Sequence, residues 1–221
     1  MLNTYYAIRH GQSTANVANL ISSCPVHGAT HHPLTPLGRT QAAAAGERLR
    51  EELGADLGSL TLYSSAFLRA VETRDVAAAA LRPAFSQARP GSELPVGVLG
   101  ALRERDFGAL DGLPTGVYDA VWPRDREDAY ARHADGVEPV ASVVGRLAEM
   151  LEALERRHAG EALGLVAHAD VLQIFQCWLA GCDVRSFAEY RFGNGEVREC
   201  GLDAGCLPFP EPMKSQKHAA A

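Results

Sequence analysis

The segment Tyr5-Tyr6-Ala7-Ile8-Arg9-His10-Gly11-Gln12-Ser13 joins an apolar, strand-like run to an arginine, a histidine and a glycine. The pattern predicts a short buried strand, with Arg9 and His10 where the chain leaves a sheet. Arginine offers phosphate oxygens a planar fork of donors, and a neutral imidazole has a lone pair that can attack phosphorus. The alternative is a surface arginine beside a hydrogen-bonded histidine, and three residues alone do not decide between the two.

The composition fits one globular domain with an acidic surface. The chain has 221 residues, 47% of them hydrophobic, and we expect a single domain over residues 1–206 with a flexible tail over 207–221. A formal net charge of −6 and a pI of about 5.7 disfavour nucleic-acid and membrane partners. Recognition of phosphate therefore requires a local group of arginines.

Cysteine usage and the lack of a long apolar segment predict a soluble, cytoplasmic protein, either a monomer or a homodimer. The N-terminus does not have the basic start and apolar stretch of a signal peptide, and polar residues interrupt the apolar region from 163 to 180. An odd number of cysteines without a C-x-x-C pair suits free thiols in a reducing compartment. The five cysteines are Cys24, Cys177, Cys182, Cys200 and Cys206.

Strand and helix patterns alternate along the rest of the chain. Thr35-Pro36 supplies an N-cap and a first-turn proline to one helix, while Ser64 or Ser65 is the expected cap of another that Pro83 helps to end. Beyond the strand at 4–8, the patterns predict a helix to about Leu53, a strand at 60–63, a helix through about Leu81, a helix from 140 to about 157, a strand at 162–167 and a helix at 171–179.

This alternation predicts an α/β fold, a three-layer α/β/α arrangement with a mainly parallel central sheet flanked by helices. Ligands of such sheets collect at the carboxyl ends of strands. Arg9 and His10 follow the first strand, Arg69 is expected about one turn into the helix after the second, and His168 closes the late strand. Taken singly, Arg69 could be a helix-surface cation and His168 a core histidine, but their convergence favours a phosphate site.

Ordered motifs over residues 4 to about 180 resemble the histidine phosphatase superfamily, also called phosphoglycerate mutase-like. The resemblance implies that fold, with His10 as the nucleophile that becomes phosphohistidine and Glu104 as the proton donor. It also implies no metal or other cofactor, since fixed cations stabilise the transferred phosphoryl group. The motifs are Arg9 to Ser13 with Asn16, Leu34-Thr35 to Gly38 with Gln41-Ala42, Ser64 to Arg69 with Thr73, Leu102, Glu104, Phe107-Gly108, Asp111-Gly112, and Val166 to Ala169.

The resemblance assigns the phosphoryl oxygens to Arg9, Asn16, Arg69 and His168, with His168 also counted as catalytic. Asn16 has an alternative role as a turn former or helix cap. Glu104 could instead be a solvated charge, with Asp106 as the reserve acid. A proton donor needs a raised pKa, and the adjacent Arg103 and Arg105 would oppose that shift in the pKa if they pointed inward.

The chain departs from the family pattern near the second histidine and on the substrate side. Ala169 stands where glycine is frequent, and Asp170 is expected to favour the protonated form of His168. Gln12 replaces a glutamate of the mutases, and the glycine-glutamate-serine motif of many relatives is present only as Val137-Glu138-Pro139.

Two loops lead directly from the site motifs. Residues 17–34 follow the nucleophile and residues 112–136 follow the acid, so we expect both to shape the mouth of the site and select the substrate. His27, His31 and His32 gather in the first loop, but no cysteine or carboxylate at a recognised ligand spacing suggests a metal site there. We expect a polar loop.

The first hypothesis for function is a phosphatase that hydrolyses a phosphomonoester, either a small phosphorylated molecule or a phosphoprotein. The runner-up is a phosphoglycerate mutase, which shares the catalytic residues. Family mutases have a longer segment between the acid and the second histidine than Glu104 to His168 allows, which favours transfer to water. A third hypothesis is a catalytically inactive phospho-ligand binding protein, which the intact His10 and Glu104 disfavour.

Overall fold

A computed structural model describes residues 2–201, so the tail expected at 207–221 lies outside the described residues. Its centre is a five-stranded sheet in the order β3-β2-β4-β1-β5. All neighbouring pairs are parallel except β1 and β5, which confirms the mainly parallel sheet. The strands are β1 (Thr4–Arg9), β2 (Leu60–Ser64), β3 (Val96–Val98), β4 (Ala162–Ala167) and β5 (Val197–Cys200).

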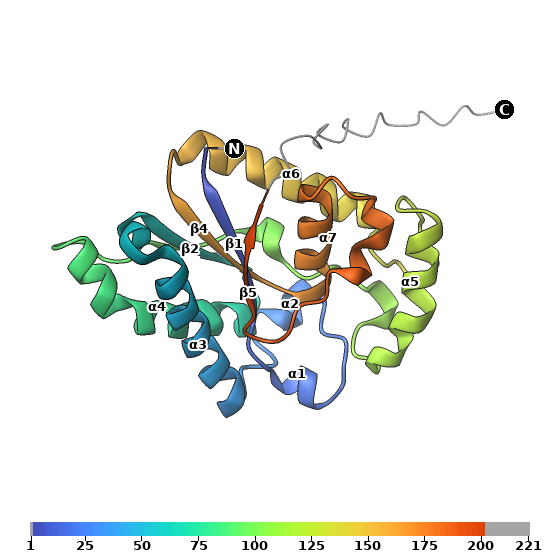
Figure 1. The fold of residues 1–221 in the computed structure, drawn as a ribbon. Coiled ribbons are helices and arrows are strands. Elements are labelled where there is room, and N and C mark those ends of the chain that lie inside the picture. The colour runs from blue at the N-terminus through green and yellow to red at the C-terminus, as the bar shows by residue number, and fades with distance from the viewer. Residues whose placement is uncertain (1, 202–221) are drawn as a thin grey trace.

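Helices cover both faces of this sheet, as Figure 1 shows, and the expected three-layer arrangement is confirmed. Helices α3 and α4 pack on one face, and α6 and α7 pack on the other. The helices are α1 (Thr14–Val17), α2 (Pro25–Gly28), α3 (Pro36–Leu53), α4 (Leu68–Ala88), α5 (Tyr118–Glu127), α6 (Val140–Arg157) and α7 (Ala169–Leu179).

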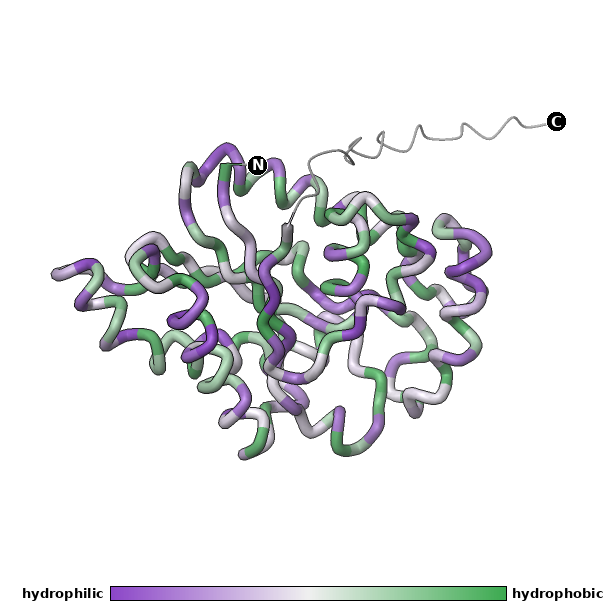
Figure 2. Tube along the Cα trace, in the orientation of Figure 1, coloured by the Kyte–Doolittle hydropathy of each residue, from purple (hydrophilic) through white to green (hydrophobic). Residues whose placement is uncertain are grey.

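The strand of the nucleophile motif is buried on both faces. Successive side chains of a strand point to opposite faces, so Tyr5 and Ala7 join the core under α6 and α7, while Tyr6 and Ile8 join the core under α3 and α4. This explains why its sequence is a continuous apolar run, as in other buried parallel strands. The covering helices instead alternate between hydrophobic and hydrophilic residues along their length (Figure 2).

Helix α4 differs from expectation at both ends. It begins at Leu68 after Phe67, because the Ser65 hydroxyl is engaged by the Phe67 N–H (3.2 Å) and by His168 rather than by the helix. Arg69 is therefore its second residue and does not lie one turn in. Pro83 does not end the helix, which continues to Ala88. The reason is that Leu81 and Phe85, one turn apart, are both buried in the core while Pro83 faces solvent.

Replacement of Pro83 with alanine is expected to stabilise the protein by about 1–3 kcal/mol, because a proline inside a helix removes one backbone hydrogen bond and clashes with the preceding turn. Urea unfolding followed by circular dichroism measures the change in the free energy of unfolding. The neighbouring Arg82→Ala variant is the control and should stay within about 0.5 kcal/mol of the parent. A destabilised Pro83→Ala variant would show that the proline fits this helix without cost.

The four cysteines within residues 2–201 are free thiols, as expected, and Cys206 lies outside the described part. Cys177 and Cys200 are buried, whereas Cys182 is exposed. Within the same residues, no helix is both long enough and apolar enough to cross a membrane.

The two loops expected at the mouth of the site are hydrogen bonded to each other. The Ile21 N–H donates to the Leu113 carbonyl (2.9 Å), and the Gly112 N–H donates to the Ile21 carbonyl (2.9 Å). Together they form a lobe beside the carboxyl ends of β1 and β4, with a small core of its own. That core contains Ile21, Phe107, Val121 and Val137.

Candidate active site

A cavity of about 310 Å³ lies where the two central strands end and the lobe begins. Of the residues expected at the site, Arg9, His10, Asn16, Arg69 and Glu104 line it. His168 lies directly behind, with its ring centroid 5.3 Å from that of His10. The fold therefore brings together all six residues that the sequence placed in one site.

His10 has the protonation state that a nucleophile needs. Its Nδ1 lies 2.7 Å from the Gly11 carbonyl oxygen, which can only accept, so the proton is on Nδ1 and the lone pair is on Nε2. Burial, followed by the charges of Arg69 and Arg9, lowers the pKa of His10 well below its usual value of 6.5. The imidazole is therefore neutral at physiological pH, with Nε2 available for attack.

The two arginines of the site are held by the backbone of distant segments. Arg9 donates to the Phe192 carbonyl (2.6 Å), and its buried Nε has no hydrogen-bond partner within residues 2–201. Arg69 donates from Nε to Nε2 of His10 (3.1 Å) and from its two terminal nitrogens to the hydroxyl and carbonyl of Ser22 (3.1 and 2.8 Å). Both cations thus line the cavity with His10, and Arg69 contacts its Nε2 directly.

The backbone around the nucleophile crosses helix α3 at very short range. A side chain on Gly11 would place its Cβ 2.2 Å from the Gly38 carbonyl oxygen, and one on Gly38 would come 2.0 Å from the Gln12 carbonyl oxygen. The Thr35 hydroxyl caps α3 at Gly38 N–H (3.0 Å) and also donates to the Gln12 side chain (2.9 Å). The glycines therefore fix the loop that carries His10.

Glu104 is a buried carboxyl whose protonation is favoured by its surroundings. Burial first, and then the charge of Asp170, raises the pKa of Glu104 from 4.5 to about 7. The charges of Arg69 and Arg9 and the Arg105 N–H, which donates to Glu104 Oε1 (2.9 Å), lower this pKa in part, but the side chains of the flanking arginines are bound elsewhere. Arg103 binds Glu138 through two hydrogen bonds (2.9 and 2.8 Å), and Arg105 binds Asp125 through two of 2.7 Å. Each flanking guanidinium thus pairs with a carboxylate other than Glu104, and Arg103 shares Glu138 with Arg146.

His168 is neutral, contrary to the expectation that Asp170 would favour its protonated form. Burial, followed by Arg69 and His10, lowers the pKa of His168 well below 6.5. Asp170 instead lies 3.5 Å from Arg105 and accepts a hydrogen bond of 3.5 Å from Trp122. The Nε2 atom of His168 contacts the Ser65 hydroxyl (2.9 Å), and its Nδ1 lies 3.9 Å from the Glu104 carboxyl.

Replacement of Asp170 with asparagine is expected to lower the pKa of Glu104, because the charge of Asp170 is one cause of its increase. If Glu104 acts as the acid, the alkaline decline of kcat/KM should move to lower pH in this variant. A pH profile of kcat/KM on a phosphomonoester checks this. The control is Asp119→Asn, which removes the same charge from an exposed site, and an identical profile in both variants would contradict the coupling.

Asn16 has the helix-cap role considered for it, and its contact with phosphate stays a prediction. Its side chain lines the cavity, and it forms a capping box with Ser13 at the start of α1, in which Oδ1 accepts from the Ser13 N–H (3.0 Å). The reserve acid Asp106 does not line the cavity, and its carboxylate accepts from the Gly108 N–H (2.9 Å). Of these two carboxyl groups, Glu104 is therefore the one that lines the cavity with His10.

Sequence reasoning missed several residues around the cavity. The lobe contributes Ser22, Tyr118 and Trp122, which the loop ranges contained without marking them individually. Arg191 and Phe192 come from a segment for which the sequence showed no pattern. Only an apolar run or a motif could have marked Arg191 and Phe192 in the sequence, and neither residue belongs to one.

The histidine-rich loop also differs from expectation. His27 and His31 pack with their ring centroids 5.6 Å apart. The sequence showed no thiol or carboxylate at a recognised ligand spacing, but the fold brings Cys24 and Asp111 to His27, with one donor atom of each residue within 4.8 Å of the others. Asp111 comes from a remote part of the chain, which spacing alone could not reveal.

A parallel-sheet edge that gathers two histidines, two arginines and a buried carboxyl is the site of an enzyme that acts on phosphate esters. The model of the histidine phosphatase superfamily (branch 1) matches residues 5–208, and the chain belongs to this superfamily. Its phosphoglycerate mutase-like fold is thereby confirmed.

Characterised relatives include both mutases and phosphatases. A 2,3-bisphosphoglycerate-dependent phosphoglycerate mutase from Methylobacterium sp. (strain 4-46) is 32% identical over 180 residues, 78% of each chain. One from Bartonella henselae is 34% identical over 60% of this chain and 56% of its own. Among solved structures, a mycobacterial glucosyl-3-phosphoglycerate phosphatase in complex with VO3 has a TM-score of 0.67 at 27% identity, with 89% of this chain and 91% of that one covered.

Proposed function

We propose that this protein is a metal-independent phosphomonoester hydrolase that works through a phosphohistidine on His10. The observation that carries this proposal is the pairing, in one cavity, of the unprotonated Nε2 of His10 with a carboxyl of Glu104 whose pKa is raised to about 7. A nucleophile without a proton and an acid with one are the two groups that cleavage of a phosphate ester requires.

In the first step, Nε2 of His10 attacks phosphorus and the bond to the ester oxygen breaks. Glu104 gives its proton to the leaving oxygen, so the alcohol departs neutral and Glu104 becomes a carboxylate. The Gly11 carbonyl, which accepts from Nδ1–H, stabilises the positive charge that develops on the ring. Arg9, Arg69 and His168 face the three equatorial oxygens, where the negative charge is spread.

In the second step, the Glu104 carboxylate takes a proton from water, whose oxygen attacks the phosphohistidine. The P–N bond breaks, inorganic phosphate leaves, and both His10 and Glu104 return to their starting forms. Arg69 must exchange its bond to His10 for the phosphoryl oxygens at the start of this cycle, and the unpartnered Nε of Arg9 offers a further donor.

The direct test is turnover of p-nitrophenyl phosphate by the full chain in EDTA. Two arginines and neutral donors supply the charge stabilisation in this proposal, so turnover should persist under chelation. Absence of turnover between pH 5 and 8 with a panel of phosphomonoesters would contradict the proposal. The same panel identifies the substrate class, small phosphorylated molecule or phosphoprotein.

A phosphoglycerate mutase is the second candidate, supported by the identity to such mutases over 78% of the chain. It would use the same first step and pass the phosphoryl group to a second substrate rather than to water. Interconversion of 3- and 2-phosphoglycerate, stimulated by 2,3-bisphosphoglycerate and faster than release of inorganic phosphate, would favour this candidate over the hydrolase.

A further inference from the structure

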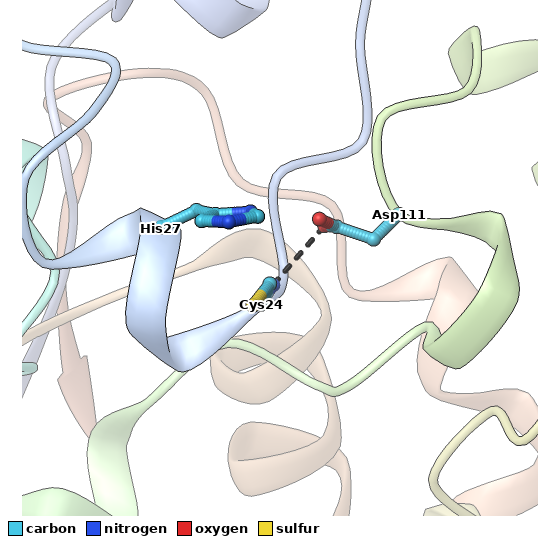
Figure 3. Close-up of side chains that lie close together, drawn as sticks. All are labelled: Cys24, His27 and Asp111. Carbon is cyan, nitrogen blue, oxygen red and sulfur yellow. Dashed lines mark hydrogen bonds between the residues drawn. The ribbon is translucent and has the colours of Figure 1, made fainter.

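Three metal-binding side chains of different types meet at the outer side of the lobe. Cys24 precedes α2, and His27 lies three residues later on the same helical turn. Asp111 reaches them from the segment that follows the acid motif, and Figure 3 shows its carboxylate directed toward both. One donor atom from each residue lies within 4.8 Å of the other two. None of the three lines the catalytic cavity.

Each of these three side chains keeps at least one possible metal-donor atom that makes no hydrogen bond within residues 2–201. Oδ1 of Asp111 accepts from Ser23 N–H (2.5 Å), the Ser23 hydroxyl (3.0 Å) and Cys24 N–H (3.1 Å), which fixes the carboxylate and leaves Oδ2 without a hydrogen bond within residues 2–201. In the same part of the chain, the Cys24 thiol and the ring nitrogens of His27 also make none. Hydrogen bonds to one oxygen of a carboxylate orient the other oxygen, as the supporting hydrogen bonds of metal ligands do.

We propose that Cys24, His27 and Asp111 form a zinc site that clips the two loops of the lobe together. A thiolate, an imidazole and a carboxylate are the ligand types that zinc takes, and the two anionic ligands neutralise its charge. Cys24 and His27 supply two ligands from one turn, and Asp111 supplies a third from a remote segment, so one ion would tie the two segments together.

The geometry requires only a small closure. Zinc bonds of about 2.0–2.3 Å place neighbouring tetrahedral ligands roughly 3.3–3.8 Å apart, so the donor atoms must approach by about 1 Å. His27 is exposed and can rotate to do this, while Asp111 is fixed. His31, whose ring packs on that of His27, or a water molecule supplies the fourth ligand.

The clip would act on the catalytic site through one residue. Ser22, two positions before Cys24, binds the Arg69 guanidinium through its hydroxyl and its carbonyl. The Ser23 hydroxyl accepts from Phe107 N–H (3.0 Å), in the small core of the lobe. Metal binding would therefore hold the segment that positions Arg69, without contact between the ion and the reacting atoms.

The test is titration of the metal-free full chain with Co²⁺ and Zn²⁺. We expect one equivalent of Co²⁺ to produce a thiolate charge-transfer band, Zn²⁺ to displace it, and Zn²⁺ to raise the melting temperature. Cys24→Ser should abolish the band, and His27→Ala should weaken zinc binding by at least about tenfold. Cys182→Ser, which removes an exposed thiol elsewhere, should bind like the parent.

Circular dichroism of each metal-free variant shows whether it is folded. A parent chain without a thiolate band, or a folded Cys24→Ser variant that binds zinc like the parent, would overturn the proposal. If Cys182→Ser lost zinc binding while Cys24→Ser retained it, the thiolate ligand would be Cys182, and the proposal would be overturned as well. If the thiolate band formed but the melting temperature did not change, the proposal that the metal clips the two loops together would be overturned.

Discussion

Replacement of His10 with alanine is expected to lower kcat by at least about 10⁴-fold, because it removes the nitrogen on which the proposed covalent intermediate forms. The measurement is twofold: steady-state hydrolysis of p-nitrophenyl phosphate, and rapid-quench labelling with a ³²P-labelled ester. The parent should show an acid-labile, alkali-stable phosphoenzyme, and the variant should show none. Nε2 of His10 accepts from Arg69 in the cavity (3.1 Å), whereas Nε2 of His168 is engaged with the Ser65 hydroxyl (2.9 Å).

The control for this experiment is Arg82→Ala, which removes an exposed side chain outside the cavity and should leave kcat unchanged. Urea unfolding of both variants excludes a loss of fold. If His10→Ala still formed an acid-labile phosphoenzyme, the nucleophile would be a different histidine and the proposed mechanism would be wrong. If the parent bound labelled ester without forming a phosphoenzyme, the chain would be a phospho-ligand binding protein.

Replacement of Glu104 with glutamine is expected to lower kcat by about 10²–10⁴-fold for alkyl phosphates, whose leaving oxygen needs a proton. The loss should be smaller in the phosphorylation step of p-nitrophenyl phosphate, since nitrophenolate leaves without protonation. Comparison of the two esters therefore separates a lost acid from a general disturbance of the site. The control is Asp106→Asn, a carboxylate outside the cavity, which should retain turnover with both.

The pH dependence of the parent follows from the same group. A raised pKa keeps the Glu104 carboxyl protonated to higher pH, so kcat/KM should fall as pH rises through about 7. The lowered pKa of His10 keeps its ring neutral below 6.5, so the rate should persist on the acid side. Glu104→Gln should remove the alkaline decline near pH 7, and a decline that persisted unchanged in this variant would assign it to another group.

The sequence predicted that Arg9, His10 and His168 lie close together because they stand at the ends of strands with clear apolar patterns. Arg9, His10 and His168 stand at the ends of β1 and β4, and parallel pairing of these strands places Arg9 opposite Ala167. Such pairing is a general property of parallel sheets, so the convergence needed no knowledge of side-chain packing.

The remaining features depend on tertiary contacts that a local pattern does not contain. The predicted start of α4 was wrong because the Ser65 hydroxyl contacts His168 instead of capping the helix. The predicted end was wrong because burial of Phe85 outweighs the cost of Pro83 inside the helix. The directions of Arg103 and Arg105 depend on Glu138 and Asp125, which lie 35 and 20 residues away. Residue types alone do not show which carboxylate a cation will find.

The sheet order has a consequence for how the enzyme is made. The strand that carries the nucleophile lies between β4, which begins at Ala162, and β5, which begins at Val197. At about 5–20 residues per second, a ribosome needs roughly 8–30 s after His10 is synthesised to reach the first of these partners. His10 is thus made early and positioned late, so a chain that stalls before β4 contains the histidine without the strand that positions it.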